Sequence, residues 1–240
     1  MKIAGWRAIF PAVTNPLQYK YLVRGVWAAS TALTLACAAR NDPAKPPPPL
    51  PTAPIPTTNL AGQRVMVLPV TLALAAETLD WQEALGERRA MLARTDSLIG
   101  ALLTERAPEV NWVLPAELRR NAHLSAGMVG DPSQFPTATL RYEELEEIPG
   151  PLQADLRNLA AVSRARYGLV PAALLWVPAD TAAAVRAVVQ GSGAGTAELT
   201  LVIVDTRLSR IGFRTVARGA GDDPWTALAR AVKAALPGLP

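Results

Sequence analysis

Arg64-Val65-Met66-Val67-Leu68-Pro69-Val70 is the first stretch of the chain that can enter a folded core, and the predicted fold is built outward from it. A short apolar run after Gly62 predicts a buried β-strand. Pro69 has no amide hydrogen to donate to a neighbouring strand, so the strand is expected to stop there.

The elements that follow this strand alternate between helix and strand. In chain order we predict helical segments within 75–94, a helix from about 95 to 107, a strand at 110–114, a helix at 115–122, a loop at 121–142, a helix from Pro151 that ends at Gly168, strands at 169–177, 185–190, 197–205 and 211–217, and a last helix from Pro224. Thr95 or Asp96 is the predicted N-cap of the second helical segment, and Asp223 that of the last. The order predicts an α/β (α+β) fold with a single mixed β-sheet flanked by helices.

A different kind of segment comes before the predicted domain at residues 60–240. Residues 26–36 form an uncharged, mainly apolar run of 11 residues after Arg24, where a membrane-spanning helix needs about 20. With the small Ala36 before Cys37, residues 1–36 resemble a bacterial lipoprotein signal peptide with its lipobox. The resemblance implies that Cys37 is acylated and becomes the new amino terminus.

Two features depart from the usual lipoprotein pattern. Thr34 stands where leucine is usual, and the region before the apolar run is long, so a translation start near Val23 is an alternative to Met1. The alternative for Cys37 is a buried thiol in an amphipathic segment. Ala38 follows the cysteine instead of aspartate, and the sorting rule known for such lipoproteins then implies the outer membrane, with the protein facing the periplasm.

Residues 37–59 are predicted to be a proline-rich, disordered tether. Eight prolines lie within residues 43–56. Such a composition favours polyproline II, which extends by about 3.1 Å per residue and so acts as a spacer. The alternative is a docking peptide for a partner.

Charge and composition exclude several classes of function. The chain has 24 Lys and Arg against 20 Asp and Glu, and four of the basic residues but no acidic ones lie within residues 1–36, so the remainder is formally neutral. A nucleic-acid-binding domain would concentrate basic charge instead. The single cysteine excludes an intrachain disulfide and Cys-rich zinc sites, and the single histidine, His123, excludes a His-pair metal motif. We predict no metal and no cofactor.

Several segments occur in an order that matches a known family. They are Val67-Leu68-Pro69, Asn111–Leu114, Ala165–Leu169 and Leu201–Phe213. Over about residues 60–238 the pattern resembles envelope lipoprotein domains of the family that includes the amino-terminal domain of TolB, the curli secretion lipoprotein CsgG and the lipoprotein activators of penicillin-binding proteins. The resemblance implies the fold and the envelope compartment, with a scaffold or partner role. One departure is Leu208-Ser209-Arg210, where the family usually has glycine, and another is a long insertion near 125–148.

Trp81, Asp205 and Arg207 are the predicted partner-binding residues. Trp81, Trp112, Trp176 and Trp225 are expected to be core or near-core anchors, and one left exposed would mark an interface. Trp81 is the best candidate for such an exposed ring, because its helical segment is otherwise polar. Asp205 ends a strand, where it can accept hydrogen bonds from turn amides, and Arg207 can pair with it. A purely structural role is the alternative for this turn.

These observations predict a lipid-anchored lipoprotein of the cell envelope that binds a protein partner or acts as a scaffold, without catalysis; they leave the oligomeric state open. One alternative is a membrane-tethered hydrolase, with Asp, Glu and Ser residues converging near the 121–150 loop, which holds His123 and the acidic run Glu143–Glu147. Another is a binder of small ligands or cell-wall glycans, with an apolar cleft lined by Trp112 or Trp176. Gly191–Gly195 is predicted to be a hairpin turn, because it lacks the strand-to-helix context of a phosphate loop.

Overall fold

The computed structural model describes residues 53–179 and 195–236. The predicted signal peptide with Cys37, most of the predicted tether, the predicted strand at 185–190 and all but Gly195 of the glycine-rich turn lie outside the described residues.

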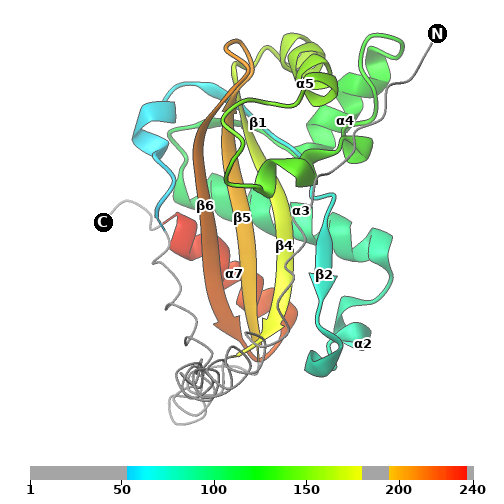
Figure 1. The fold of residues 1–240 in the computed structure, drawn as a ribbon, viewed down its shortest axis with the longest axis vertical. Helices are drawn as coiled ribbons and strands as arrows, with labels where there is room; N and C mark the ends of the chain where they lie inside the picture. The colour runs from blue at the N-terminus through cyan, green and yellow to red at the C-terminus, as the bar shows by residue number, and fades with distance from the viewer. Residues whose placement is uncertain (1–52, 180–194, 237–240) are drawn as a thin grey trace, which may run out of the picture. The chain divides into compact units, whose positions relative to one another are not determined.

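A six-stranded mixed sheet is the centre of the described part (Figure 1). Its strands are β1 Arg64–Val67, β2 Ala73–Ala75, β3 Asn111–Val113, β4 Tyr167–Pro178, β5 Gly195–Asp205 and β6 Arg210–Gly221. The spatial order is β3-β1-β4-β5-β6, and β2 pairs with β4 beyond the end of β1. The pairs β1–β3, β1–β4 and β2–β4 are parallel, whereas β4–β5 and β5–β6 are antiparallel. The predicted mixed sheet is therefore confirmed.

Helices cover both faces of this sheet. The α-helices are α2 Gln82–Leu85, α3 Arg88–Arg106, α4 Pro115–Leu124, α5 Gly150–Ser163 and α7 Pro224–Ala235, and the short 3-10 helices are η1 Thr57–Leu60, η2 Glu77–Leu79, η3 Pro132–Gln134 and η4 Thr137–Arg141. α3 and α7 pack on one face, and α4 and α5 on the other. Among the described residues, no helix combines the length and the apolar character needed to cross a membrane.

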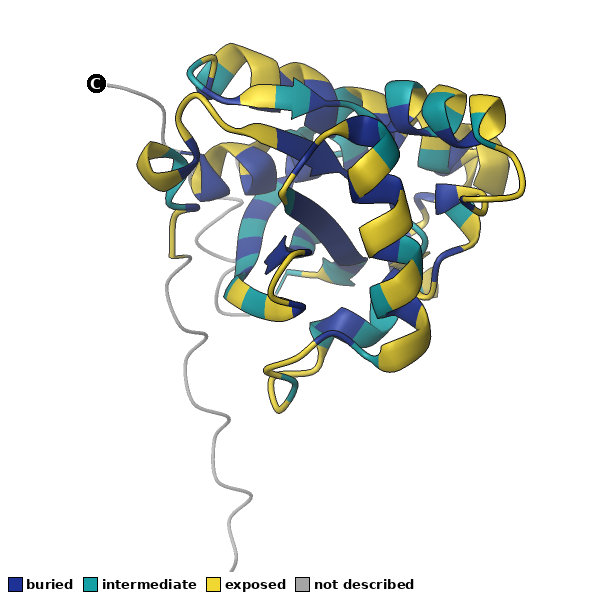
Figure 2. Ribbon diagram, turned by 90° about the horizontal axis from the view of Figure 1, so that it is seen from above, coloured by how far each residue is buried: buried dark blue, intermediate teal, exposed yellow. Residues whose placement is uncertain are grey.

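The two faces of the sheet carry separate hydrophobic cores, as expected from strands that are apolar on both sides. In β5, Leu201 and Ile203 belong to the core under α3 and α7, while Val202 and Val204 belong to the core under α4 and α5. Figure 2 shows the buried strands enclosed by helices whose outer surfaces are exposed. Successive side chains of β5 therefore enter the two cores in turn.

α7 lies very close to β6 at a glycine. A Cβ atom on Gly219 would lie 2.2 Å from the backbone nitrogen of Ala231 and 2.4 Å from the carbonyl oxygen of Ala227.

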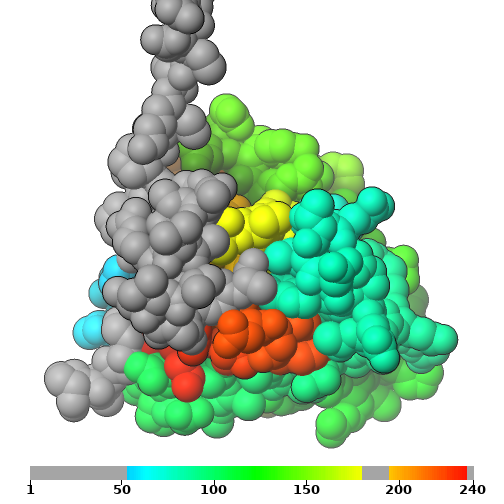
Figure 3. Space-filling model, turned by 90° about the horizontal axis from the view of Figure 1, so that it is seen from below, coloured from blue at the N-terminus to red at the C-terminus, as the bar shows by residue number. Residues whose placement is uncertain are grey.

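Asp223 caps α7 as predicted, because its carboxylate accepts hydrogen bonds from the amides of Trp225 and Thr226. At the same end of the sheet, α7 lies beside the segment that contains α2 (Figure 3), and the Trp225 indole donates to the Ala84 carbonyl.

The prediction that Thr95 or Asp96 caps a helix is wrong. α3 begins at Arg88 and continues to Arg106, so both residues lie in its middle and are buried. Asp96 accepts a hydrogen bond from the backbone amide of Val70 and one from the guanidinium of Arg119. Residues that favour N-caps do so because they accept hydrogen bonds, and here the donors come from distant parts of the chain.

The predicted end of α5 at Gly168 is also wrong. α5 ends at Ser163, and Arg164 follows it in the left-handed conformation with φ of 52°. Gly168 lies inside β4, where a Cβ atom would be 3.0 Å from Cγ2 of Val204 and 3.2 Å from Cε of Met66. This glycine marks a close approach within the core under α4 and α5 instead of a helix end.

The packed part of the described chain begins before residue 60, the predicted start of the domain. Ile55 is buried, and its amide donates to the carbonyl oxygen of Ala235 at 2.9 Å. Leu60 at the end of η1 is buried as well. Residues 55–59 therefore belong to the packed structure, although they were predicted to be part of the tether.

Candidate functional site

The turn between β5 and β6 contains two of the predicted site residues. The carboxylate of Asp205 accepts hydrogen bonds from the amides of Arg207 and Leu208 at 3.0 and 3.1 Å, as expected for an aspartate at a strand end. Its other oxygen accepts two bonds from the guanidinium of Arg166, at 3.0 and 2.7 Å. The expected ion pair between Asp205 and Arg207 is therefore wrong; Arg166 takes that place, and the side chain of Arg207 is exposed.

Further contacts fix the shape of this turn. The amide and the hydroxyl of Thr206 both donate to the carbonyl of Arg166. Ser209 adopts a left-handed φ of 58°; its carbonyl accepts from the amide of Ile148, and its hydroxyl from the side-chain amide of Gln153. Ser209 thus takes a backbone conformation that usually favours glycine, within the segment where the sequence departs from the family pattern. The turn is held from α5 and from the preceding loop as well as from its own strands.

A leucine and several arginines are exposed on this fixed turn. Leu208 is 59% exposed at the connection. The exposed arginines of the turn and of the segment that hydrogen-bonds to it are Arg164, Arg166, Arg207 and Arg210. We call these five residues the turn surface.

The acidic run Glu143–Glu147 lies along the beginning of β6, next to the turn. Glu147 forms an isolated antiparallel bridge with Arg210, and the guanidinium of Arg214 donates to the carbonyls of Leu140, Glu143 and Leu145. The four glutamates of this run are exposed. The backbone of the run is therefore fixed on the sheet, while its carboxylates face solvent.

The pKa of Asp205 lies below its usual range. Burial alone would raise this pKa, but the guanidinium of Arg166 and the amides of Leu208 and Arg207 lower it further than burial raises it. The ionised form of Asp205 is therefore the form that holds the turn.

We expect Asp205→Asn to lower the free energy of unfolding at pH 7 by about 1 kcal/mol, because the charged partner of Arg166 is lost. A carboxylate whose pKa is lower in the folded than in the unfolded state stabilises above the unfolded value of about 4, and this stabilisation is lost as the pH falls through the folded value. Urea unfolding of both proteins at pH 7 and near pH 3 checks this. A difference in free energy of unfolding between Asp205→Asn and the wild type that is the same at pH 7 and near pH 3 would contradict the ion pair of Asp205 with Arg166.

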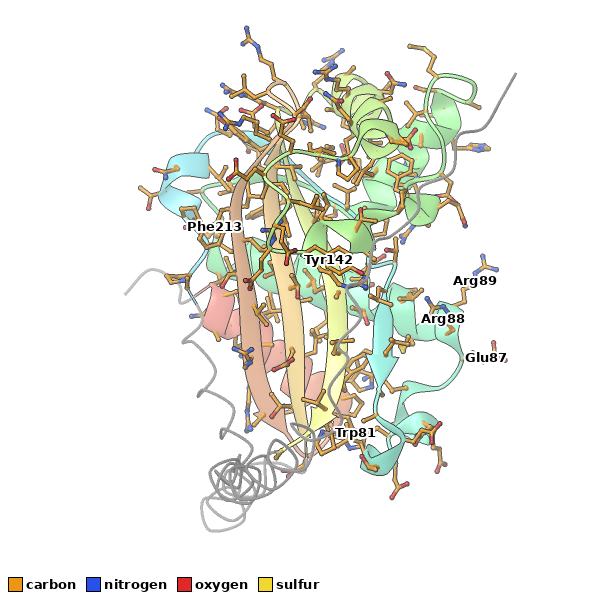
Figure 4. All side chains as sticks on the ribbon, viewed as in Figure 1. Trp81, Glu87, Arg88, Arg89, Tyr142 and Phe213 are labelled. Carbon is orange, nitrogen blue, oxygen red and sulfur yellow. The ribbon has the colours of Figure 1, made fainter. Side chains whose placement is uncertain are left out.

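Trp81 is a core residue, which is the alternative expected for it, and its proposed place in an interface is wrong. Its side chain is 6% exposed and belongs to the core under α3 and α7, close to the lower end of β4 (Figure 4). A Cβ atom on Gly195 would lie 2.6 Å from the indole ring. The segment is not one polar helix: η2 ends at Leu79, Asp80 follows with a left-handed φ of 51°, and α2 starts directly after Trp81. The break turns the ring inward.

In the described part of the 121–150 segment, His123 and Asp131 line one hollow of about 370 Å³, but no hydrogen-bonded set of serine, histidine and carboxylate forms there. Asp131 accepts from the amide of Ser133 and caps η3, and the Ser133 hydroxyl accepts from the guanidinium of Arg119. His123 is exposed in the last turn of α4. Within the described ranges, no serine hydroxyl is hydrogen-bonded to His123 or to a carboxylate, and the Glu143–Glu147 run lies apart from η3, along β6.

Neither predicted tryptophan lines an apolar cleft. Trp176 is buried, and its indole donates to the carbonyl of Pro224. Trp112 is half-buried beside a hollow of about 380 Å³ whose lining includes the ion pair Arg64–Glu117. In the part of the chain that the structure describes, no group of three or more His, Cys, Asp or Glu side chains could hold a metal ion.

Comparison with known proteins gives weak similarities only. No family model and no curated protein matches the chain. Solved structures similar to it include the following three. The LpoB C-terminal domain from Escherichia coli has 12% identity and a TM-score of 0.32 and covers 65% of this chain and 83% of its own. Lipoprotein GNA1162 from Neisseria meningitidis has 14% identity and a TM-score of 0.31 and covers 65% and 79%. A PelC L103M dodecamer from Paraburkholderia phytofirmans has 12% identity and a TM-score of 0.31 and covers 78% and 95%.

Similarities with TM-scores this low carry no argument about function. The resemblance to the TolB and CsgG family therefore stays a prediction from the sequence. The fold class itself does not depend on these comparisons, because the mixed sheet and its helices are described directly.

Proposed function

We propose that the protein is a lipid-anchored lipoprotein of the cell envelope, held at the outer membrane and facing the periplasm, whose folded domain binds a protein partner without catalysing a reaction. The sequence around Cys37 supports the anchor: a basic residue, an apolar run of 11 residues and a small residue come before it, and a proline-rich stretch follows. Acyl chains on this cysteine would supply about 0.8 kcal/mol of membrane affinity per buried CH₂ group.

The turn surface is the observation that carries the binding proposal. Leu208 is exposed on a backbone that Asp205 fixes with hydrogen bonds to two turn amides. Because this backbone is already fixed, binding does not have to pay the entropy of ordering the turn. Exposed arginines surround Leu208, and arginine is common among the residues that dominate protein interfaces. In this arrangement Leu208 and Arg207 contact the partner, while Asp205 positions them.

We expect the double variant Leu208→Ser, Arg207→Ala to retain at least tenfold less partner than the wild type, because a central apolar anchor and a charged contact are lost together. The measurement is affinity isolation of the acylated full chain from membranes, with bound proteins quantified. Leu124 and Arg120 provide the matched control, because both are exposed and lie on α4. Leu124→Ser, Arg120→Ala should retain the partner.

Two further readouts make the result decisive. All variants should have the same thermal midpoint, since only exposed side chains change. Cys37→Ser should move the chain out of the membrane fraction, as expected if acylation at Cys37 is the anchor. Equal recovery of the partner with the turn variant and the wild type would contradict the proposal, and retention of the Cys37→Ser chain in membranes would contradict the anchor.

A further inference from the structure

A groove lies outside the carboxyl end of β1, on the side of the sheet away from β6. Its volume is about 860 Å³. The segment after β1 contributes Val70 and Thr71, and the beginning of α3 contributes Arg88 and Arg89. Arg119 comes from α4, and Ser133 comes from η3. We call it the arginine groove. Figure 4 shows Arg88 and Arg89 at the beginning of α3, beyond β2.

The topology of the sheet explains why there is a groove here. After β1 the chain leaves the sheet and rejoins it as β2, and both strands pair with β4. β1 also has a parallel neighbour on each side, β3 and β4. In open sheets, ligands bind at the carboxyl ends of neighbouring parallel strands whose connections run to opposite faces of the sheet.

A buried acid holds one of the groove's arginines in place. The side chain of Asp96 is 5% exposed, and its carboxylate accepts from the amide of Val70 and from the guanidinium of Arg119. Arg119 also donates from Nε to the hydroxyl of Ser133 and remains 39% exposed. Burying a carboxylate is costly unless it is paired and hydrogen-bonded. The pair thus gives Arg119 a fixed orientation at the groove.

Arg88 and Arg89 have no acidic partner among the described residues. The guanidinium of Arg88 donates one hydrogen bond, to the carbonyl of Thr71, and Arg89 makes no hydrogen bond to a described residue; both side chains are exposed. The acids at the groove are engaged already: Asp96 with Arg119, and Asp131 with the amide of Ser133. This end of the groove therefore offers guanidinium groups that lack a carboxylate.

We propose that the arginine groove binds an extended acidic segment of a protein partner. Guanidinium groups bind carboxylates with two parallel hydrogen bonds, which gives both affinity and orientation. The volume is within the range of pockets that enclose ligands much larger than a single inorganic anion. Leu92 and Ala93 add aliphatic surface to the lining, which suits carboxylates carried on carbon stems along a chain. This site is separate from the turn surface and does not depend on it or on the lipid anchor.

The test uses the full chain in detergent and a dye-labelled synthetic peptide, Glu-Glu-Leu-Glu-Glu with blocked ends. We expect saturable binding by fluorescence anisotropy at low ionic strength, weakened by added salt because the contacts are exposed ion pairs. Arg88→Ala, Arg89→Ala should bind the peptide about tenfold more weakly. The matched control is Arg120→Ala, Arg157→Ala, which removes two exposed arginines that lie on α4 and α5 outside the groove, and it should bind like the wild type.

Four results would overturn the proposal. Two of them are unchanged affinity in Arg88→Ala, Arg89→Ala and equal binding of the neutral peptide Gln-Gln-Leu-Gln-Gln. The third is displacement of the acidic peptide by an equal concentration of inorganic phosphate, which would indicate a phosphate site. The fourth is self-association of the wild type that Arg88→Ala, Arg89→Ala abolishes, which would make a second copy of this chain the occupant. Because the partner isolation above uses different residues, failure of either proposal leaves the other testable.

Discussion

Gly219→Ala is expected to lower the free energy of unfolding by more than about 3 kcal/mol, or to prevent folding. The added methyl group would lie 2.2 Å from the amide nitrogen of Ala231 and 2.4 Å from the carbonyl oxygen of Ala227. Both are backbone atoms of α7, so no side chain can rotate away to relieve the overlap. The helix would have to move off β6, which would expose the buried Leu228 and Val232.

Gly212→Ala is the matched control on the same strand. The nearest atom to a Cβ at this position is the carbonyl oxygen of Ile203, at 3.7 Å, which is an ordinary contact. We expect a change within about 0.5 kcal/mol. Urea unfolding followed by circular dichroism measures both variants. Equal stability of the two alanine variants would show that α7 is not seated on β6 as described.

Arg119→Gln is expected to lower the free energy of unfolding by about 2–4 kcal/mol, because Asp96 is then buried without its charged partner. Adding Asp96→Asn should restore most of this loss. The asparagine oxygen can still accept from the amide of Val70, and the buried charge is gone. The double variant should therefore be more stable than Arg119→Gln alone, although it carries one more substitution.

The pH dependence of Arg119→Gln provides a second check. Burial raises the pKa of Asp96, while the amide of Val70 and the guanidinium of Arg119 act in the opposite direction. Loss of Arg119 removes one of these opposing effects. A carboxyl group with a raised pKa in the folded state binds more protons there than in the unfolded chain, so stability increases as the pH falls through the folded value toward about 4. The difference in free energy of unfolding between the wild type and Arg119→Gln should therefore be smaller at pH 4 than at pH 7. A difference that does not shrink, or a double variant that is less stable than Arg119→Gln alone, would contradict this role of Asp96.

Local sequence signals predicted the features whose partners are near in the chain. Asp223 accepts from amides two and three residues away, and Asp205 does the same in its turn. The strand at β1 and its end before Pro69 follow from the apolar run and from proline chemistry. In each case a few neighbouring residues contain the complete physical cause.

Features that depend on distant partners were missed. Asp205 pairs with Arg166, which is 39 residues away, whereas proximity in sequence suggested Arg207, two residues away. Asp96 bonds to groups 26 and 23 residues away, so its capping propensity was misleading. Trp81 turns inward because the polar segment around it breaks at Asp80.

The arginine groove has no sequence signature. Arg88 and Arg89 lie on one helix and Arg119 on another, and they meet only because the chain leaves the sheet after β1 and two helices close over that point. A buried carboxylate in the middle of α3 is the one signal that could have indicated it, but burial of Asp96 is not readable from the polar residues beside it in the sequence.

Photo-crosslinking from position 208 tests the central claim, that the turn surface contacts a protein partner, most directly. A photoreactive amino acid would replace Leu208 in the acylated chain in intact cells, and the same amino acid at position 124, which is at least as exposed, serves as the reference. We predict a discrete protein adduct from position 208 and none from position 124, with the adduct lost in the Cys37→Ser background. Absence of an adduct at position 208, or the same adducts from both positions, would contradict the account.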